Sequence, residues 1–259
     1  MYIYELVLET TRKCNLRCAH CMRGNPQRMT MTPQILQAVL SSCTGIGTVT
    51  FGGGEPSLAP EVFEEFFNIS HWRHINFESF YIVTNGKAHN GLSRFMRAVD
   101  RLYWMAGEQD ACSLVVSQDQ YHKALREVNW GRYEMKDETG RSYDEFPPYF
   151  DMKSRTGDIH NPIAEGRAIE TQVGWREPEQ QKPFEVEEYN GEVHVRSDDA
   201  KYVYVAANGN VVSGCNMSFR RIDKESKGNV LQKPLSEIIE GYCVRKDEEV
   251  EEEKQAVSV

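Results

Sequence analysis

Three cysteines near the start of the chain are the residues best suited to bind a metal. Cys14, Cys18 and Cys21 have the spacing C-x-x-x-C-x-x-C and directly follow an apolar stretch. A structural zinc site usually takes four protein ligands, often as two separated pairs. A 4Fe–4S cluster held by three cysteines would instead leave one iron open to another ligand. This spacing favours the cluster over a zinc knuckle or chance clustering.

The other four cysteines are scattered: Cys43, Cys112, Cys215 and Cys243. Their scatter and the odd total of seven argue against a secreted disulfide framework. Cys43 and Cys112 lie on apolar faces, so we expect them in the core rather than among metal ligands.

Further candidate site residues follow the second, third and fourth predicted strands. They are Gly53-Gly54-Glu55-Pro56 after residues 48–51, Thr84-Asn85-Gly86 after residues 80–83, and Ser117-Gln118-Asp119 after residues 113–116. Barrel enzymes build their active sites where parallel strands end. We therefore expect these segments to meet the cysteine loop, which follows a first predicted strand at residues 2–8.

Strand and helix patterns alternate through the first two-thirds of the chain. Thr32-Pro33 predicts a helix start, with an apolar face ending at Cys43 and a stop at Gly45. Further helices are expected within residues 62–67 and 92–102, and a fifth strand at residues 149–152; residues 132–148 have no assigned element. This alternation predicts an α/β fold with a parallel sheet, built as a partial barrel.

The character of the sequence changes near residue 170. We expect residues 1–170 to form the barrel, 171–200 a polar connector, 201–245 a small α+β extension, and 246–259 an acidic disordered tail. Within the extension, Asn208-Gly209 predicts a hairpin with a type I′ turn over residues 201–212. A short helix is expected at residues 235–242.

The cysteine motif, with His20 at a usually aromatic position, resembles that of the radical S-adenosylmethionine (SAM) superfamily. The segments at Gly53, Asn85 and Ser117 stand where related enzymes have GGEP, TNG and S-x-D. The resemblance covers residues 1–125 and implies a partial (β/α)6 barrel. It also implies a 4Fe–4S cluster bound by Cys14, Cys18 and Cys21, which cleaves SAM reductively to a 5′-deoxyadenosyl radical.

The resemblance implies SAM contacts from all four segments, namely His20, Gly53, Gly54, Glu55, Asn85, Ser117 and Asp119. The glycines would let backbone approach the methionine amino group, so valine there is expected to weaken SAM binding with the cluster intact. Glu55 would hold its loop in place. Ser117 and Asp119 are the candidate hydrogen-bond partners of the ribose, and the resemblance favours Ser117. His20 would lie beside the adenine. For Asn85, a turn residue that tolerates positive φ is as good an interpretation as a SAM contact. No residue is assigned a catalytic role.

The C-terminal part resembles the SPASM/Twitch extensions of some radical SAM enzymes, at residues 207–215, 228–230 and 234–239, preceded by Gly166-Arg167-Ala168. An auxiliary cluster takes four thiolates, whereas only Cys215 and Cys243 remain here. We therefore expect a degenerate extension without a second cluster.

The function of the protein has three interpretations, two of which differ in the substrate. Such extensions suggest a ribosomal peptide or protein maturase. A likeness to small bacterial and bacteriophage radical SAM proteins suggests an isomerase that rearranges amino-acid-modified thymine in DNA hypermodification. A non-catalytic iron–sulfur redox protein is the third. Arg23, Arg155 and Arg167 are candidate contacts to a carboxylate or phosphate. The expected electron donor is a low-potential protein such as flavodoxin or ferredoxin.

Composition and hydropathy restrict the partners and the cellular location that we expect for the protein. The 259 residues carry a net charge of −9, which argues against nucleic-acid binding by charge alone. The mean hydropathy is −0.58, and no apolar run approaches the roughly 18 residues of a membrane span. The N-terminal residues lack the pattern of a secretory signal. We expect no membrane partner and a cytoplasmic location, in the host cytoplasm if the gene belongs to a phage.

Overall fold

The computed structural model describes residues 1–87, 90–117, 162–196 and 202–245. It also gives the backbone of three two-residue strands, β5 (Met135–Lys136), β6 (Ser142–Tyr143) and β7 (Ser154–Arg155). The predicted strand at residues 149–152 and the predicted tail at residues 246–259 lie outside this part of the chain.

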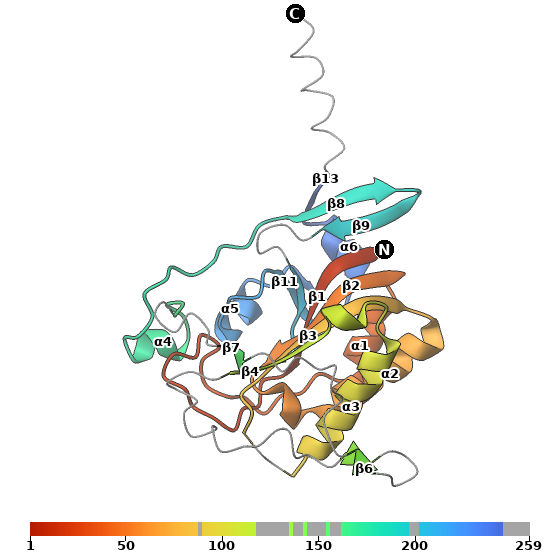
Figure 1. Ribbon diagram of the computed structural model, residues 1–259. Helices are drawn as coiled ribbons and strands as arrows, with labels where there is room; N and C mark the ends of the chain where they lie inside the picture. Colours follow the sequence, from red (N-terminus) through yellow and green to blue (C-terminus); the bar gives the residue numbers. More distant parts are fainter. Residues whose placement is uncertain are drawn as a thin grey trace, which may run out of the picture.

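A mostly parallel sheet forms the centre of the molecule (Figure 1). Its strands β1 (Tyr2–Thr11), β2 (Gly45–Gly53), β3 (Asn76–Thr84) and β4 (Ser113–Ser117) are neighbours in chain order, and β7 follows β4. Every pair in this series is parallel, so the carboxyl ends share one edge. This confirms the predicted α/β fold class and its partial-barrel sheet.

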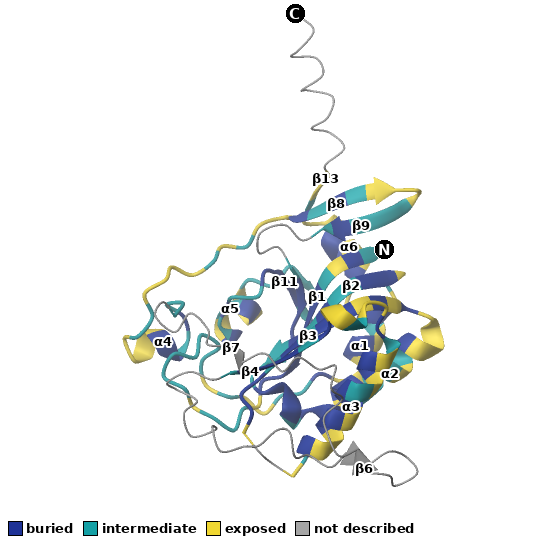
Figure 2. Ribbon diagram, viewed as in Figure 1, coloured by how far each residue is buried: buried dark blue, intermediate teal, exposed yellow. Residues whose placement is uncertain are grey.

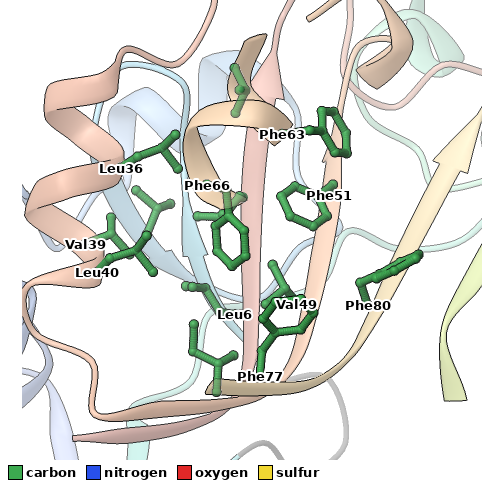
Figure 3. Packing of buried hydrophobic residues seen from close by; sticks show 14 of the residues in the cluster. Leu6, Leu36, Val39, Leu40, Val49, Phe51, Phe63, Phe66, Phe77 and Phe80 are labelled. Atoms are coloured by element: carbon green, nitrogen blue, oxygen red, sulfur yellow. The ribbon is translucent and has the colours of Figure 1, made fainter. Parts of the chain in front are cut away.

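The helices α1 (Pro33–Leu40), α2 (Pro60–Arg73) and α3 (Leu92–Met105) connect these strands. Their buried faces form one hydrophobic core with the sheet, in which α1 residues such as Leu36 and α2 residues such as Phe63 pack over Leu6 and Phe51 (Figure 3). Figure 2 shows exposed residues along the outer side of the same helices. Burial of this apolar surface supplies the main driving force for the layered arrangement.

The start of α1 follows its sequence signal, but its end does not. The Thr32 hydroxyl accepts a hydrogen bond from the Ile35 amide at 3.4 Å, and Pro33 is the first helical residue. The helix ends at Leu40 with Ser41 as its cap, so the expected stop at Gly45 is wrong. Gly45 instead begins β2, where a Cβ would come within 2.9 Å of the Tyr2 ring.

The C-terminal residues continue the same sheet on the other side of β1. The strand β10 (Val203–Val205) runs parallel to β1, and β11 (Asn210–Ser213) and β12 (Gly228–Asn229) follow it in antiparallel order. The helix α5 (Phe219–Lys224) packs with β10, β11 and Val7 in a second, smaller hydrophobic cluster. The short helices α4 (Arg167–Glu170) and α6 (Leu235–Glu240), the strand β13 (Cys243–Arg245) and the 3-10 turns Pro56–Leu58 and Gln109–Ala111 complete the elements.

The polar connector expected at residues 171–200 contains a β-hairpin. The strands β8 (Phe184–Tyr189) and β9 (Glu192–Arg196) pair in antiparallel order, and β9 also pairs with the start of β1. Phe184, Val186 and Val195 are buried in the main core. The acidic residues that suggested a connector alternate with these apolar ones, so the segment has the period of a half-buried strand.

The type I′ turn forms at a different Asn-Gly pair from the one expected. Asn190 and Gly191 both have positive φ, 54° and 78°, and join β8 to β9 as such a turn requires. At Asn208-Gly209 only Gly209 has positive φ, 87°, and its amide donates to the Ala206 carbonyl at 2.8 Å. That geometry fits the longer hairpin loop in which glycine occupies the left-handed position.

None of the helices in the described residues is both long and apolar enough to span a membrane.

Candidate active site

The cysteine loop begins where β1 ends. The Cys14 sulfur accepts hydrogen bonds from the Leu16 amide at 3.4 Å and from the Asn85 side-chain amide at 3.8 Å. The Cys21 amide donates to the Cys18 carbonyl at 3.2 Å, and all three cysteines are partly buried. Burial raises the pKa of Cys14 above its usual value, so this thiol stays protonated at neutral pH unless a metal binds it.

The three thiols do not gather around a single point. No group of three His, Cys, Asp or Glu side chains within the described part of the chain is placed to hold one metal ion. In a 4Fe–4S cluster each cysteine binds a different iron, so the sulfurs lie further apart than the ligands of one ion. Three cysteines on one loop, with N–H groups donating to the Cys14 sulfur, are a donor set that fits such a cluster.

Gly53, the last residue of β2, and Gly54, which follows it, are required for contact with the segment that leads into the cysteine loop. The Gly54 amide donates to the Thr11 carbonyl at 2.7 Å, and the Glu55 amide donates to the Lys13 carbonyl at 2.8 Å. A Cβ at Gly53 or Gly54 would lie 2.2 Å from the Thr11 or Lys13 carbonyl oxygen, and Gly53 has a φ of +127°. The sequence suggested cofactor approach for these glycines, whereas close backbone packing already demands them.

Glu55 joins the ends of β2 and β3. Its carboxylate is 1% exposed and accepts hydrogen bonds from the Ser57 amide and hydroxyl, the Thr84 hydroxyl and the Asn85 amide, at 2.6–3.1 Å. A carboxylate with all these donors holds the two strand ends together. The hydrogen bonds fit the expected loop-holding role of Glu55.

Asn85 links β3 to the cysteine loop. Its side-chain amide donates to the Asn15 side-chain oxygen at 2.9 Å as well as to Cys14. The residue with positive φ in this turn is Gly86, at 74°, and not Asn85. The interpretation of Asn85 as a positive-φ turn residue is therefore wrong.

The remaining predicted SAM contacts lie on the same edge or outside the described residues. Ser117 is the last residue of β4 and stands opposite Arg155 of β7 in the backbone ladder. His20 is partly buried within the cysteine loop. Asp119 and the Arg155 side chain are outside the described part of the chain.

A buried network beneath the cysteine loop was not predicted from the sequence. Arg12 is fully buried; its Nε donates to Glu9 at 2.5 Å and its two Nη atoms donate to the Asp223 carboxylate at 2.7 and 2.8 Å. The Tyr204 hydroxyl donates to the other Glu9 oxygen at 2.7 Å. The charged residues Glu9, inside the mostly apolar first strand, and Arg12, directly after it, were the signal that could have indicated it.

Arg23 and Arg167, two of the three arginines proposed to contact the substrate, make contacts within the fold. The Arg23 side chain donates to the Met217 carbonyl at 2.7 Å and lies over the Tyr204 ring. Arg167 is 8% exposed, and its backbone amide donates to the Cys21 carbonyl at 3.0 Å. Its Nε and Nη1 atoms are buried and have no hydrogen-bond partner among the described residues. Neither arginine has the open surroundings of a solvated surface residue.

The other four cysteines pack in or against the hydrophobic clusters. Cys43 and Cys112 are in the main hydrophobic core, and burial raises the pKa of the Cys43 thiol to about 12. Cys215 packs against the second hydrophobic cluster, whereas Cys243 packs against the main core. The core positions of Cys43 and Cys112 confirm the expectation from their apolar faces.

Comparison with known proteins yields one family match. Residues 8–103 match the model of the Radical SAM superfamily. No curated protein sequence significantly matches this chain.

Two similar solved structures share low sequence identity with this chain. Native anSMEcpe with bound AdoMet and Cp18Cys peptide is 15% identical, with a TM-score of 0.49 over 93% of this chain and 80% of that chain. Streptococcus suis SuiB bound to S-adenosylmethionine is 14% identical, with a TM-score of 0.47 over 92% of this chain and 65% of that chain.

The matched region includes the cysteine loop, the glycine segment and Asn85, together with the strands β2 and β3 that carry the last two. Enzymes of the matched family use a 4Fe–4S cluster together with SAM. Residues 8–103, which include the cysteine loop, the glycine segment and Asn85, are therefore similar to the radical SAM superfamily domain.

Proposed function

We propose that this protein cleaves SAM reductively and uses the resulting radical to abstract hydrogen from an amino-acid-like group. The observation that carries the proposal is the hydrogen-bonded contact among three strand ends. Asn85 contacts Cys14 and Asn15 from β3, and Glu55 from β2 binds the Asn85 amide at 2.7 Å. Residues whose order matches the superfamily pattern are thus joined at one edge of the sheet.

In this proposal Cys14, Cys18 and Cys21 hold the 4Fe–4S cluster, and SAM lies along the carboxyl edge. When bound, the reduced cluster and SAM together supply a 5′-deoxyadenosyl radical. Asn85 orients the loop around Cys14 by donating to its sulfur. The Glu55 carboxylate accepts four hydrogen bonds from Ser57, Thr84 and Asn85, so it positions residues 55–57 and 84–85.

The proposed SAM contacts are backbone groups of Gly53 and Gly54 and side chains of His20, Asn85, Ser117 and Asp119. Ser117 stands at the end of β4, where a hydroxyl can reach a ribose bound along the same edge. The C-terminal residues 201–245 are proposed to be a SPASM/Twitch-like extension without a cluster. Their two cysteines pack against different hydrophobic clusters, which supports the absence of a shared ligand set.

The test is formation of 5′-deoxyadenosine by anaerobically reconstituted protein reduced with dithionite. The wild type is expected to bind about four irons per chain and to release 5′-deoxyadenosine from SAM. A Cys14→Ala/Cys18→Ala/Cys21→Ala variant should do neither, whereas Cys112→Ala, which changes a core thiol, should do both. A loaded wild-type cluster that yields no 5′-deoxyadenosine would favour a non-catalytic iron–sulfur redox protein.

Two substrate classes follow from the sequence, a peptide or protein and an amino-acid-modified thymine in bacteriophage DNA. Mass spectrometry distinguishes the two classes. Nucleosides and peptides are compared between cells with active enzyme and cells with the triple cysteine variant. A modified peptide supports a maturase, and an isomerised thymine derivative supports the DNA-modifying isomerase.

A further inference from the structure

Arg167, the first residue of α4, is a buried arginine with unused hydrogen-bond donors. Its side chain is 8% exposed, and its Nε and Nη1 atoms have no hydrogen-bond partner in the part of the chain that the structure describes. Burial removes a guanidinium from water, so a buried guanidinium without an acceptor or a counter-charge costs free energy. We therefore expect an anion other than these residues to pair with Arg167.

Other charged residues around the cysteine loop have partners within the protein. Arg12 donates to two carboxylates, and Arg23 donates to a backbone carbonyl and lies over an aromatic ring. Glu165 is the carboxylate nearest to Arg167 in the sequence, but it accepts from the Arg221 side chain at 2.6 Å. The lack of a partner is thus particular to Arg167 among these arginines.

The backbone around Arg167 is fastened to the cysteine loop. The Arg167 amide donates to the carbonyl of Cys21, the third cysteine of the motif, at 3.0 Å. A Cβ at Gly166, which has a φ of +54°, would lie 2.3 Å from the Met22 carbonyl oxygen. This close packing places the start of α4 directly against the residues that carry the proposed cluster ligand.

We propose that the Arg167 guanidinium is the positive counter-charge of the 4Fe–4S cluster and raises its reduction potential. The inference rests on the proposed function, since it requires a cluster bound by Cys14, Cys18 and Cys21. A cluster with three thiolate ligands carries net negative charge, and reduction adds a further negative charge. Positive charge and hydrogen-bond donors near the cluster stabilise the reduced form, so Arg167 makes the one-electron reduction easier.

A carboxylate of SAM or of the substrate is the competing anion. The location favours the cluster, because the Arg167 amide is bonded to a residue that supplies one of the cluster ligands. The cluster also stays bound through the whole reaction cycle, whereas SAM and substrate leave. A resident counter-charge avoids the free-energy cost of an unpaired buried guanidinium between turnovers.

The experiment measures the midpoint potential of the cluster by EPR-monitored titration with dithionite, once without SAM and once with it. Dithionite is oxidised as one electron enters each cluster. Arg167→Gln removes the charge and Arg167→Lys keeps it. The control is Thr171→Val, which removes an exposed hydroxyl that donates to the Ala19 carbonyl of the same loop at 2.8 Å. Iron content is measured first, so that each potential refers to loaded protein.

Arg167→Gln is expected to disfavour reduction roughly tenfold without SAM, which is a fall of about 59 mV in the midpoint potential of a one-electron couple. Arg167→Lys and Thr171→Val should stay close to wild type, because neither changes the charge. Failure of Arg167→Gln to load a cluster that Arg167→Lys loads with an unchanged potential would also support the counter-charge.

An unchanged potential in Arg167→Gln, or an equal fall in Thr171→Val, would overturn the inference. A fall that occurs only with SAM would overturn it by assigning Arg167 to the SAM carboxylate. Loss of the cluster from both Arg167→Gln and Arg167→Lys would overturn it by assigning Arg167 to the fold. The first titration contains no SAM, so a wild type that is reduced but yields no 5′-deoxyadenosine would contradict only the proposed function.

Discussion

At the scale of the residue, three consecutive glycines at the end of β2 have different surroundings. A Cβ at Gly52 would meet no atom within 4 Å, whereas one at Gly53 or Gly54 would press on backbone carbonyls of the segment that leads into the cysteine loop. Backbone cannot move aside as the end of a flexible side chain can. The structure therefore replaces the expectation that these substitutions weaken SAM binding alone.

Gly54→Ala should displace the cysteine loop, because the Lys13 carbonyl lies where the methyl group would be. We expect a loss of about 1–3 kcal/mol in the free energy of unfolding, together with reduced iron content after reconstitution. Denaturant titration and iron analysis measure both. Gly52→Ala is the matched control and should retain wild-type iron. Normal iron and stability in Gly54→Ala, with weakened SAM binding, would restore a role in cofactor approach alone.

At the scale of the element, the C-terminal helix α5 is joined to β1 through one arginine. The Asp223 carboxylate on α5 accepts hydrogen bonds from both Nη atoms of the buried Arg12. Partial burial opposes ionisation of Asp223, but hydrogen bonds and charge from Arg12 outweigh it and lower the pKa of this carboxyl. The ion pair therefore stabilises the folded state only while Asp223 is ionised.

Asp223→Asn should lower the free energy of unfolding by about 1–2 kcal/mol at neutral pH, because one partner is partly exposed to solvent. A lowered folded pKa means that the contribution is present above the unfolded value of about 4 and is lost as pH falls below it. Urea unfolding at several pH values should show the difference from wild type shrinking towards acid. A difference that is constant with pH would exclude the ion pair as its source.

Cys215, between β11 and α5, and Cys243, at the start of β13, pack against different hydrophobic clusters. Since two thiolates fall short of the four that an auxiliary cluster takes, Cys215→Ala/Cys243→Ala should leave iron content unchanged. A modest loss of stability is expected from the truncated apolar contacts. Iron analysis and low-temperature EPR should show one reducible cluster in both proteins. A second signal that disappears in the double variant would make the extension a cluster-binding unit.

At the scale of the whole molecule, the predicted barrel and extension share one sheet. The strand β1 pairs with β2 on one side and with β10 and the start of β9 on the other. The predicted boundary at residue 170 thus separates strands that are neighbours in space. The C-terminal residues also supply Tyr204 and Asp223, the partners of the buried Glu9 and Arg12.

A fragment of residues 1–170 should therefore fail to fold as a soluble monomer. It would leave one edge of β1 unpaired and would remove Tyr204 and Asp223, the C-terminal partners of the buried Glu9 and Arg12. Circular dichroism and size-exclusion chromatography are expected to show aggregation or loss of cooperative unfolding, with the full chain as control. A monomeric fragment with a cooperative transition would establish the barrel as an independent domain.

The sequence by itself determined the features that depend on local spacing. The cysteine motif is contiguous, and the segments at Gly53 and Asn85 directly follow apolar runs of strand length, so their meeting at one edge followed from parallel pairing. The α/β fold class followed from alternating periodicities. Thr32-Pro33 marked the start of α1, because capping involves only neighbouring residues.

Only the tertiary structure decided the features that depend on contacts between distant residues. Arg12 and Asp223 are 211 positions apart, and no local pattern pairs them. Glycine is required at positions 53 and 54 because a Cβ there would meet backbone carbonyls of another segment. The hairpin of β8 and β9 was hidden because acidic residues alternate with apolar residues that enter a core formed by other strands. Periodicity records which residues prefer burial, and the chain's long-range pairing decides what they are buried against.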